Sequence, residues 1–449
     1  MLMNDTIAAI ATAHGVGSIG IIRLSGTDAY SIALSLSRRQ SLLPRYATLA
    51  ALYSNDDILL DEAILIYFEN PKSFTGEDVV EIQCHGGMIV ADQILRAVLQ
   101  KGARLAEPGE FSKRAFLNGR LDLTQAEAVA SLIEAKSNDA ARILARQMKG
   151  ELRGYIETVR DALLEILAYS EVAIDYAEED LPRDLIERIL EKLTSIRTNL
   201  SKTVESSKKR SGLMQGYRVA IIGKPNVGKS SLLNSLLDYD RAIVSDIAGT
   251  TRDTIEEQVR IGTHLIRLVD TAGIRDASDE IERIGIERSL SSIENADMVI
   301  ALFDASRDSD DEDRIIIDLI QKYGSEKRFL SVLNKSDLPK RFDDALLEGF
   351  EPIRMSCKEG TDALIGLLAL HMDHDNDSDE MMLISARQIA AVEQAIEAIE
   401  EAFDPLENGE LEFFSFHINA AIRAVASLTR PYELDEMFDK MFGQFCLGK

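Results

Sequence analysis

The chain has 449 residues, with 50 lysines and arginines against 76 aspartates and glutamates, and its formal net charge is −26 at pH 7. Such an acidic surface disfavours nonspecific binding of nucleic acid, so any nucleic-acid site must be a local basic patch. Three widely spaced cysteines predict neither a disulfide framework nor a Cys-x-x-Cys metal site, which favours a cytoplasmic protein. The sequence has no apolar run long enough to span a bilayer and no basic leader, so we expect no membrane association.

Residues 1–120 are predicted to form an α+β domain. Three strand-like apolar runs with glycine-rich breaks between them lie at 19–24, 64–68 and 79–83. From 121 the sequence becomes helical, beginning with a capping-box pattern at 124–127, and helical periodicity continues to about 210. We assign 121–215 to the first part of a helical domain.

Residues 216–371 alternate strand-like and helical segments, which predicts a doubly wound nucleotide-binding domain. The stretch 371–380 then places two histidines among aspartates; we favour a solvated acidic linker, with a metal site as the alternative. A second helical part, 372–449, begins with the capping pair Ser385 and Gln388. Its apolar face repeats at steps of three and four residues, at Ile389, Val392, Ile396, Ile399 and Phe403. We therefore expect an inserted nucleotide-binding domain between two helical segments that pack on each other.

The most specific motif is a phosphate-binding loop. Residues 223–230 read Gly-Lys-Pro-Asn-Val-Gly-Lys-Ser, a GxxxxGKS pattern between a strand-like run and a helix. Gly223 and Gly228 let backbone N–H groups face phosphates, and the helix N-terminus adds positive charge. We expect Lys229 to act in catalysis by reaching the β- and γ-phosphates, and the Ser230 hydroxyl to hold Mg²⁺. The loop residues assigned to GTP binding are Asn226, Val227, Gly228, Lys229, Ser230 and Ser231.

Three more motifs follow in the order of a guanine-nucleotide site. Asp-Thr-Ala-Gly at 270–273 ends a strand and would hold Mg²⁺ through water, and Thr251 would join the Mg²⁺ shell. Asn-Lys-Ser-Asp at 334–337 places Asp337 to accept two hydrogen bonds from guanine; ATP would leave this carboxylate unpaired, a discrimination of roughly 10⁴. Ser-Cys-Lys at 356–358 would contact the base. In register, these motifs predict GTP binding by Ser245, Asp246, Ile247, Ala248, Gly249, Thr250, Thr251, Asp270, Thr271, Ala272, Gly273, Asn334, Lys335, Asp337, Ser356 and Cys357.

The group that orients the attacking water is less obvious. Many regulatory GTPases carry a glutamine directly after Asp-x-x-Gly, but this chain has Ile274 there. Glu282 is our candidate substitute, acting directly or through a bridging water; the alternative is one more acidic residue on a solvated helix. A monovalent cation could supply positive charge between the phosphates, held by the Asn226 side chain and by carbonyls of the 245–250 loop. Two arginines could also act as arginine fingers, Arg252 and Arg275.

Further motifs are spread along the chain. They are Phe-Thr-Gly-Glu-Asp at 74–78, His-Gly-Gly at 85–87, Pro-Gly-Glu-Phe at 108–111, Arg-Ala-Phe-Leu-Asn-Gly at 114–119, Asp-Leu-Thr-Gln-Ala-Glu at 122–127 and Phe-Cys-Leu-Gly-Lys at 445–449. With these motifs the whole chain resembles the MnmE (TrmE) family of tRNA uridine 5-carboxymethylaminomethyl modification GTPases. The resemblance implies that the N-terminal domain binds a tetrahydrofolate derivative (5-formyl or methylene) and mediates homodimerisation. The residues that match the family's folate contacts by position are Arg23, Glu81, Arg120 and Lys449.

The resemblance also implies how GTP hydrolysis proceeds and what it serves. GTPase domains of two subunits would meet in the transition state, stimulated by K⁺, with Glu282 as the catalytic carboxylate. The implied K⁺ ligands are Asn226, Ser245, Ile247 and Thr250. The implied partner is the FAD-containing protein MnmG (GidA), with which the family installs an aminomethyl or carboxymethylaminomethyl group on the wobble uridine of certain tRNAs. The folate would supply the carbon, and ammonium or glycine the nitrogen.

The chain departs from the family pattern in several places. Ala-His-Gly replaces Pro-Pro-Gly at 13–15, Arg120 replaces a lysine but keeps its charge, and Ser245 replaces a threonine. Leu-Thr-Arg-Pro at 428–431 replaces Ile-Thr-Gly-Glu and bears most on the geometry of the implied folate pocket. Cys446 has two interpretations: a nucleophile or, as we favour, a binding or structural residue beside that pocket.

An alternative from another class is an Era-type ribosome-assembly or signalling switch, which shares the 223–230 loop. Such a switch would recruit partners without folate chemistry, and its first 120 residues would have no affinity for reduced folates. No basic RNA-binding domain follows the GTPase segment in the sequence, which favours the interpretation as a tRNA modification GTPase.

Overall fold

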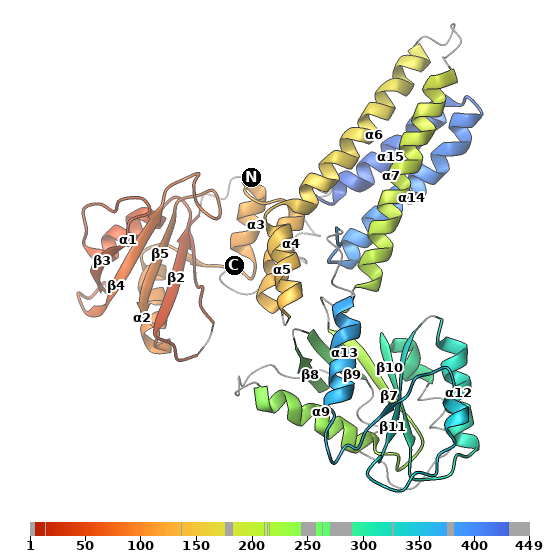
Figure 1. Cartoon of the computed structure of the whole chain (residues 1–449). Helices are drawn as coiled ribbons and strands as arrows, with labels where there is room; N and C mark the ends of the chain where they lie inside the picture. The colour runs from red at the N-terminus through yellow and green to blue at the C-terminus, as the bar shows by residue number, and fades with distance from the viewer. Residues whose placement is uncertain are drawn as a thin grey trace. The chain divides into compact units, whose positions relative to one another are not determined.

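The computed structural model describes residues 5–13, 15–135, 137–175, 183–210, 212, 214, 216–243, 257–262, 264–269, 290–325, 327–374 and 381–430. The chain divides into two compact units. The first comprises 1–133, 144–197 and 390–449, and the second comprises 134–143 and 198–389. Figure 1 colours the chain from its N-terminus to its C-terminus.

A six-stranded sheet forms the N-terminal part of the first unit, in the order β3-β4-β5-β2-β1-β6. Its strands are β1 (Ile7–Ile10), β2 (Ile19–Ser25), β3 (Thr48–Tyr53), β4 (Leu59–Phe68), β5 (Val79–His85) and β6 (Arg104–Leu105). Neighbouring strands are antiparallel except β1 and β6, which are parallel. One face is covered by the helices α1 (Ala29–Ser37) and α2 (Met88–Gln100), as Figure 1 shows. The three predicted strands are confirmed as β2, β4 and β5.

Side chains of the central strands alternate between the two faces of this sheet, because the side-chain period of a strand is two. Ile22 and Leu24 of β2 are fully buried beneath the helices, whereas Arg23 between them is half-buried. Glu81 of β5 likewise interrupts a run of buried apolar residues. The register pairs Arg23 with Glu81, so two predicted folate-binding residues lie side by side on the face opposite the helices.

Helices make up most of the rest of the first unit, and some of them also include residues of the second unit. They are α3 (Glu110–Leu117), α4 (Leu123–Glu134), α5 (Asn138–Met148), α6 (Glu151–Asp175), α7 (Arg183–Lys209), α14 (Ala386–Glu407) and α15 (Leu411–Ser427). Helix α15 packs along α6, where the hydroxyls of Ser170 and Ser415 are 2.9 Å apart (Figure 1). Arg197 of α7 lies over the Phe403 ring of α14, with 5.5 Å between guanidinium carbon and ring centroid. The prediction that helices before and after the nucleotide-binding segment pack on each other is confirmed.

Two helix N-termini test the predicted capping boxes. At α14, Ser385 caps the helix as predicted, because its Oγ accepts a hydrogen bond from the backbone N–H three residues on, at 3.2 Å. At α4 the box predicted at 124–127 is wrong. Asp122 caps the helix together with Gln125, since each side chain accepts from the other residue's backbone N–H at 3.0 Å. Thr124 instead donates its hydroxyl to the Asp122 carboxylate at 2.6 Å.

The second unit is built around another six-stranded sheet, in the order β12-β11-β10-β7-β9-β8. Its strands are β7 (Tyr217–Ile222), β8 (Glu257–Ile261), β9 (His264–Val269), β10 (Met298–Asp304), β11 (Arg328–Asn334) and β12 (Ile353–Arg354). Neighbouring strands are parallel except β8 and β9. The helices described with this sheet are α9 (Lys229–Ile243), α12 (Asp311–Tyr323), α13 (Asp362–His374) and the short 3-10 helix η1 (Asp344–Leu347).

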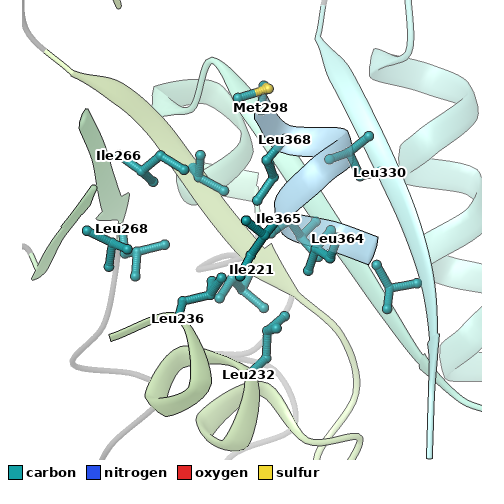
Figure 2. Packing of buried hydrophobic residues seen from close by; sticks show 14 of the residues in the cluster. Ile221, Leu232, Leu236, Ile266, Leu268, Met298, Leu330, Leu364, Ile365 and Leu368 are labelled. Atoms are coloured by element: carbon teal, nitrogen blue, oxygen red, sulfur yellow. The ribbon is translucent and has the colours of Figure 1, made fainter. Parts of the chain in front are cut away.

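Helices cover both faces of this second sheet. On one face α9 and α13 bury Leu232 and Leu364 against the sheet (Figure 2). On the other face α12 buries Ile316 and Ile320. Strands covered on both sides need apolar residues on both sides, which is why all residues of β10 are buried. The predicted multidomain fold, α+β followed by helices and a doubly wound P-loop domain, is confirmed.

Helix α13 runs beyond 371, where the nucleotide-binding domain was predicted to end. Met372 is fully buried in the core of that sheet, so the start of the 371–380 stretch is helix, and the prediction of a linker is wrong there. An apolar residue every third or fourth position extends the helix because each one still finds a partner in the core. Residues 375–380 lie outside the described part of the chain.

Candidate nucleotide-binding site

The 223–230 loop joins the carboxyl end of β7 to the first turn of α9, the edge of a doubly wound sheet where ligands bind. Gly223 and Gly228 both have positive φ angles, 157° and 107°. A Cβ atom on Gly223 would lie 2.6 Å from the Leu302 carbonyl oxygen, and one on Gly228 would lie 2.3 Å from Asn334 Nδ2. Both positions therefore require glycine, because β10 and β11 approach the loop too closely for a side chain.

Asn334 ties this loop to the segment predicted to contact the base. Its side chain is buried at the carboxyl end of β11. Its Nδ2 donates to the Val227 carbonyl at 2.8 Å, and its Oδ1 accepts from the Cys357 backbone N–H at 3.1 Å. One amide thus brings together three of the predicted motifs, in positions 223–230, 334–337 and 356–358.

Lys335 makes the next link between the same segments. Its Nζ donates to the Asn226 carbonyl at 2.8 Å and to Asp304 Oδ2 at 2.6 Å. Asp304 ends β10 and is buried. Burial alone would raise the pKa of this carboxyl, but hydrogen bonds from Lys335 and Ser306 outweigh it, and the pKa lies below its usual range. The Asp304 carboxyl is therefore ionised at neutral pH, and its contact with Lys335 holds the loop backbone at Asn226.

The 356–358 segment is held mainly through its backbone. Ser356 is buried, whereas Cys357 is half-buried. The Cys357 carbonyl accepts from Ser235 Oγ of α9 at 3.4 Å. Burial raises the pKa of the Cys357 thiol, so it is protonated at neutral pH. This residue therefore serves the loop as a small neutral side chain.

Lys229 folds back over the loop that precedes it. It is half-buried, and its Nζ donates to the carbonyls of Gly223 at 2.7 Å and Lys224 at 3.0 Å. Burial lowers the pKa of its ammonium group, because the charged form is less well solvated there. The two carbonyls fix the direction in which the ammonium points across the loop.

The remaining described candidates differ in how they are placed. Val227 is buried in the apolar core, so it faces the loop only through its backbone. Ser230 and Ser231 are exposed in the first turn of α9, and Asp337 is exposed beyond the end of β11. Other predicted residues lie outside the described part of the chain: Ser245, Asp246, Ile247, Ala248, Gly249, Thr250, Thr251, Arg252, Asp270, Thr271, Ala272, Gly273, Arg275, Glu282, Cys446 and Lys449.

The family of the chain follows from its relatives. The family model for the MnmE helical domain matches residues 123–446, and that for the GTP-binding protein TrmE N-terminus matches residues 6–120. The tRNA modification GTPase MnmE of Sulfurimonas denitrificans is 63% identical over 100% of both chains. The proteins of the same name from Sulfurovum sp. and Aliarcobacter butzleri are 58% and 57% identical; they match 100% of this chain and 99% and 100% of their own lengths.

The chain belongs to the MnmE family of tRNA modification GTPases. The resemblance read from the motifs is thereby confirmed. Solved structures give a weaker likeness. Era in complex with MgGDPNP and nucleotides of 16S ribosomal RNA is 25% identical over 40% of this chain and 66% of its own, with a TM-score of 0.26. Translation elongation factor SelB from Methanococcus maripaludis is 17% identical over 35% and 34%, with a TM-score of 0.25. TM-scores this low support no conclusion about function.

In this MnmE-family chain, the first two folate candidates form an ion pair. Arg23 Nη2 lies 2.8 Å from Glu81 Oε1, and both side chains are largely buried. The guanidinium carbon of Arg23 is 5.5 Å from the centroid of the Phe74 ring and 5.8 Å from that of Phe111. A cation held between two rings and a carboxylate is a polar spot in an apolar setting, which suits an aromatic ligand with hydrogen-bonding edges.

A third folate candidate reaches the neighbouring loop. Arg120 Nε donates to the Ser73 carbonyl at 3.1 Å, and its Cγ would be 3.1 Å from a Cβ atom on Gly76. Arg120 thus borders the 74–78 motif whose Phe74 side chain lies beside Arg23. Arg23 and Arg120 therefore border this motif, and Glu81 is held next to it only through its ion pair with Arg23.

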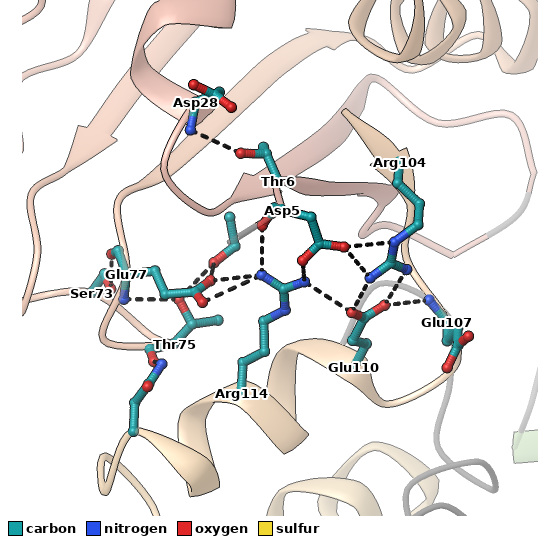
Figure 3. A network of polar contacts seen from close by, with 12 residues as sticks. Asp5, Thr6, Asp28, Ser73, Thr75, Glu77, Arg104, Glu107, Glu110 and Arg114 are labelled. Atoms are coloured by element: carbon teal, nitrogen blue, oxygen red, sulfur yellow. Dashed lines mark hydrogen bonds and ion pairs between the residues drawn. The ribbon is translucent and has the colours of Figure 1, made fainter. Parts of the chain in front are cut away.

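A network of charged side chains contacts the same motif through Glu77 (Figure 3). Arg114 is 2% exposed and donates to Asp5 at 2.7 Å, to Glu110 at 3.0 Å and to Glu77 at 3.3 Å. Arg104 pairs with Glu110 at 2.6 Å and with Asp5 at 2.8 Å. Although burial raises the pKa of Glu110, hydrogen bonds from Arg104, from a backbone N–H and from Arg114 lower it further than burial raises it. These residues fix Glu77, and with it the 74–78 motif.

No role was predicted for Glu110, Arg114 or Asp304, although the first two lie within motifs of the sequence. Glu110 and Arg114 stand four residues apart on α3, a spacing that predicts an ion pair on a helix and could have revealed the network. Asp304 is the last residue of β10 and follows six apolar residues, and a carboxylate at the carboxyl end of such a strand is a recognisable signal. Its partner Lys335 comes from another strand, so the pairing itself depends on the fold.

The described residues also bear on metal ions. Among them, no group of three or more His, Cys, Asp or Glu side chains is placed to hold a metal ion. A Mg²⁺ site at this loop would use the hydroxyl of Ser230 and nucleotide oxygens, and hard oxygen ligands are the kind that Mg²⁺ prefers. Within the same described ranges, no helix is both long and apolar enough to cross a bilayer.

Proposed function

We propose that this chain hydrolyses GTP and, with the FAD-containing partner MnmG (GidA), adds a (carboxymethyl)aminomethyl group to the wobble uridine of certain tRNAs. A tetrahydrofolate derivative, 5-formyl or methylene, would supply the one-carbon unit. The observation that carries the proposal is full-length identity of 63% to a protein named tRNA modification GTPase MnmE. The phosphate loop joined to Asn334 supports the guanine-nucleotide part of it. We place the protein in the cytoplasm as a homodimer.

The domains would divide the work along the chain. Residues 1–120 would bind folate and dimerise, 121–215 and 372–449 would form the helical domain, and 216–371 would bind GTP. In the first of these, the Arg23 and Arg120 guanidinium groups suit a folate carboxylate and the Glu81 carboxylate suits the pterin amino donors. Lys449 completes the proposed folate set.

In the GTPase domain, Lys229 would contact the β- and γ-phosphates from the first turn of α9. Asp337 would accept hydrogen bonds from guanine, with Asn334 fixing the base-binding segment. Bound Mg²⁺ would neutralise phosphate charge, and Ser230 and Thr251 would hold it. The other proposed nucleotide contacts are those named from the motifs at 226–231, 245–251, 270–273, 334–337 and 356–357.

Hydrolysis would depend on a second subunit and on K⁺. Asn226 would ligate K⁺ through its side-chain oxygen, and its place in the loop is set by the hydrogen bond from Lys335 to its carbonyl. Ser245, Ile247 and Thr250 would complete the K⁺ shell. Glu282 would orient the attacking water, the role for which Ile274 has no suitable group.

The test is steady-state GTP hydrolysis in K⁺ and in Na⁺ at matched ionic strength, for the natural protein and for Glu282→Ala. We expect strong stimulation by K⁺ and a fall in kcat of about 10²-fold in the variant, the range of positioned acid–base groups. Binding of a fluorescent GDP analogue should be unchanged, which separates catalysis from affinity. Glu294→Ala, at an exposed glutamate of the same domain, is the matched control. Equal rates in both cations and an active Glu282→Ala would overturn this mechanism.

A further inference from the structure

The phosphate loop contains two lysines, and they point to different places. Lys229 lies over the loop itself, with its Nζ on the carbonyls of Gly223 and Lys224. Lys224, the second residue of the loop, is buried. Its Nζ lies 2.6 Å from Asp313 Oδ2 and 2.7 Å from Asp310 Oδ2. At these distances the ammonium group forms charge-assisted hydrogen bonds with both carboxylates, so it is not available to bind a phosphate.

The two carboxylates belong to the start of α12. Asp310 is its N-cap, and Asp313 completes a reciprocal capping box. Asp313 Oδ2 accepts from the Asp310 N–H at 3.1 Å, and Asp310 Oδ1 accepts from the Asp313 N–H at 3.2 Å. Asp313 is fully buried, so its charge needs a cation close by, and Lys224 supplies one. The capping box and the loop lysine therefore form one charged unit.

The loop has a second anchor two residues further on. There Lys335 bridges the Asn226 carbonyl and the buried Asp304. Asp304 is the last residue of β10, Asp310 ends the connection from β10 to α12, and Asp313 lies in the first turn of α12. This single connection thus holds the loop backbone on both sides of residue 225.

We propose that Lys224 is a positioning residue for GTP hydrolysis: its ion pair with Asp310 and Asp313 holds the Lys224 carbonyl where it orients the Lys229 ammonium. The proposal rests on the GTPase function proposed above. The Nζ of Lys224 is held by the two carboxylates, which turn it away from Lys229 and toward α12. Its influence passes through one backbone carbonyl, at 3.0 Å from Lys229 Nζ. Because γ-phosphate charge develops in the transition state, a displaced Lys229 should affect kcat more than ground-state affinity.

The experiment compares Lys224→Met and Lys224→Arg with the natural protein. Methionine keeps the stem but removes the charge, so we expect kcat for GTP to fall about 10²-fold, the effect of a displacement near 1 Å, while GDP affinity changes far less. Arginine can pair with both carboxylates, so Lys224→Arg should recover most of kcat. Lys322→Met, at the exposed far end of α12, is the matched control and should behave like the natural protein. Circular dichroism and thermal unfolding establish that each variant is folded.

Two outcomes would overturn the proposal. One is a folded Lys224→Met that has lost thermal stability but kept its kcat. The other is a Lys224→Arg as slow as Lys224→Met, since restoring the charge would then restore nothing. If the natural protein fails to hydrolyse GTP, the proposed function fails separately. The dissociation rate of a non-hydrolysable GTP analogue then tests the positioning role: equal rates for the natural protein and Lys224→Met would refute it.

Discussion

At the scale of single residues, Asn334 carries more structure than its place in a motif suggests. Both ends of its amide are used, one on the Val227 carbonyl and one on the Cys357 N–H. The side chain is buried, so no solvent can replace either partner. Its Nδ2 also lies only 2.3 Å from the position that a Cβ on Gly228 would take, so the glycine of one motif and the asparagine of another depend on each other.

We expect Asn334→Asp to weaken nucleotide binding although the two side chains have the same shape. The substitution turns the Nδ2 donor into an acceptor, which then faces the Val227 carbonyl and leaves a buried charge unpaired. A loss of about 1–3 kcal/mol follows from one unsatisfied buried group, or roughly 10- to 100-fold in GDP affinity. Titration with a fluorescent GDP analogue measures it. Asn295→Asp is the control, because Asn295 is exposed and its Nδ2 donates only to the Ser291 carbonyl. Equal affinity in both variants would contradict the linking role.

The two loop lysines show which features of a residue a sequence motif can predict and which it cannot. The GxxxxGKS pattern places Lys229 correctly at the first turn of α9, because the motif defines the local backbone. The residues next to Lys224 in the sequence do not predict that its side chain turns toward α12. Its partner Asp313 lies 89 positions later in the chain and becomes its neighbour only when β7 and β10 pair. Residue types that create a turn can be predicted, whereas a partner brought by the sheet cannot.

At the scale of elements, the period of the apolar residues and their burial under other elements determine which strands and helices could be predicted from the sequence. The three strands predicted in the first sheet are found as β2, β4 and β5. The bounds of β2 and β5 agree within two positions because their apolar runs are buried, whereas β4 begins five residues earlier than predicted. The start of α4 shows the opposite case. Asp122 and Thr124 are both good capping residues, and the sequence pattern selects the wrong one. The Leu123 N–H lies 3.3 Å from the Thr429 carbonyl, so a contact from a distant helix end takes part in fixing where α4 begins.

The charged network at α3 makes a prediction about acid stability. The folded-state pKa of Glu110 lies below its ordinary value of 4.5. Its ionised form therefore stabilises the fold at any pH above that value, and the contribution is lost as pH falls through the folded pKa. Glu110→Gln removes the charge, so at pH 7 we expect a loss of about 3 kcal/mol, typical of breaking a buried pair. The difference from the natural protein should shrink as pH falls below 4.5.

Urea unfolding at pH 7 and in mild acid, followed by circular dichroism, measures this difference. Glu157→Gln is the matched control, because Glu157 pairs with Arg153 on the surface and both side chains are at least half exposed. Exposed pairs of this kind contribute less than about 1 kcal/mol. A gap between Glu110→Gln and the natural protein that stays the same from pH 7 into acid would show that Glu110 acts through packing and not through its charge.

At the scale of the whole molecule, the sequence predicts an insertion, and the structure shows how its two ends are held. After Arg197, within α7, the chain passes into the second unit, and it leaves this unit after Ile389, in the first turn of α14. Near these ends, the Ser207 hydroxyl accepts from the Leu383 N–H at 2.8 Å and donates to the Thr203 carbonyl. The insertion could be predicted because helical periodicity precedes and follows the nucleotide-binding segment. The hydrogen bond between the two ends could not be predicted, because 176 positions separate Ser207 from Leu383.

This bond leads to a prediction about coupling between GTP hydrolysis and tRNA modification. GTPase-domain motion could pass into the helical segments through the chain ends at Ser207 and Leu383. The hydrogen bond between these two residues would then make the two ends move together. Ser207→Ala leaves the buried Leu383 N–H without its acceptor, which we expect to cost about 1–3 kcal/mol of stability and to loosen that tie. K⁺-stimulated GTP hydrolysis should then continue at the natural rate, because the phosphate loop is untouched. Modification of tRNA together with the proposed flavoprotein partner should fall. Ser195→Ala, at an exposed serine of the same helix, serves as the control and should leave both rates unchanged.

Two outcomes would contradict this prediction. Loss of both activities in Ser207→Ala would mean that the substitution damages the whole fold, and full modification activity would mean that motion reaches the helices by another route.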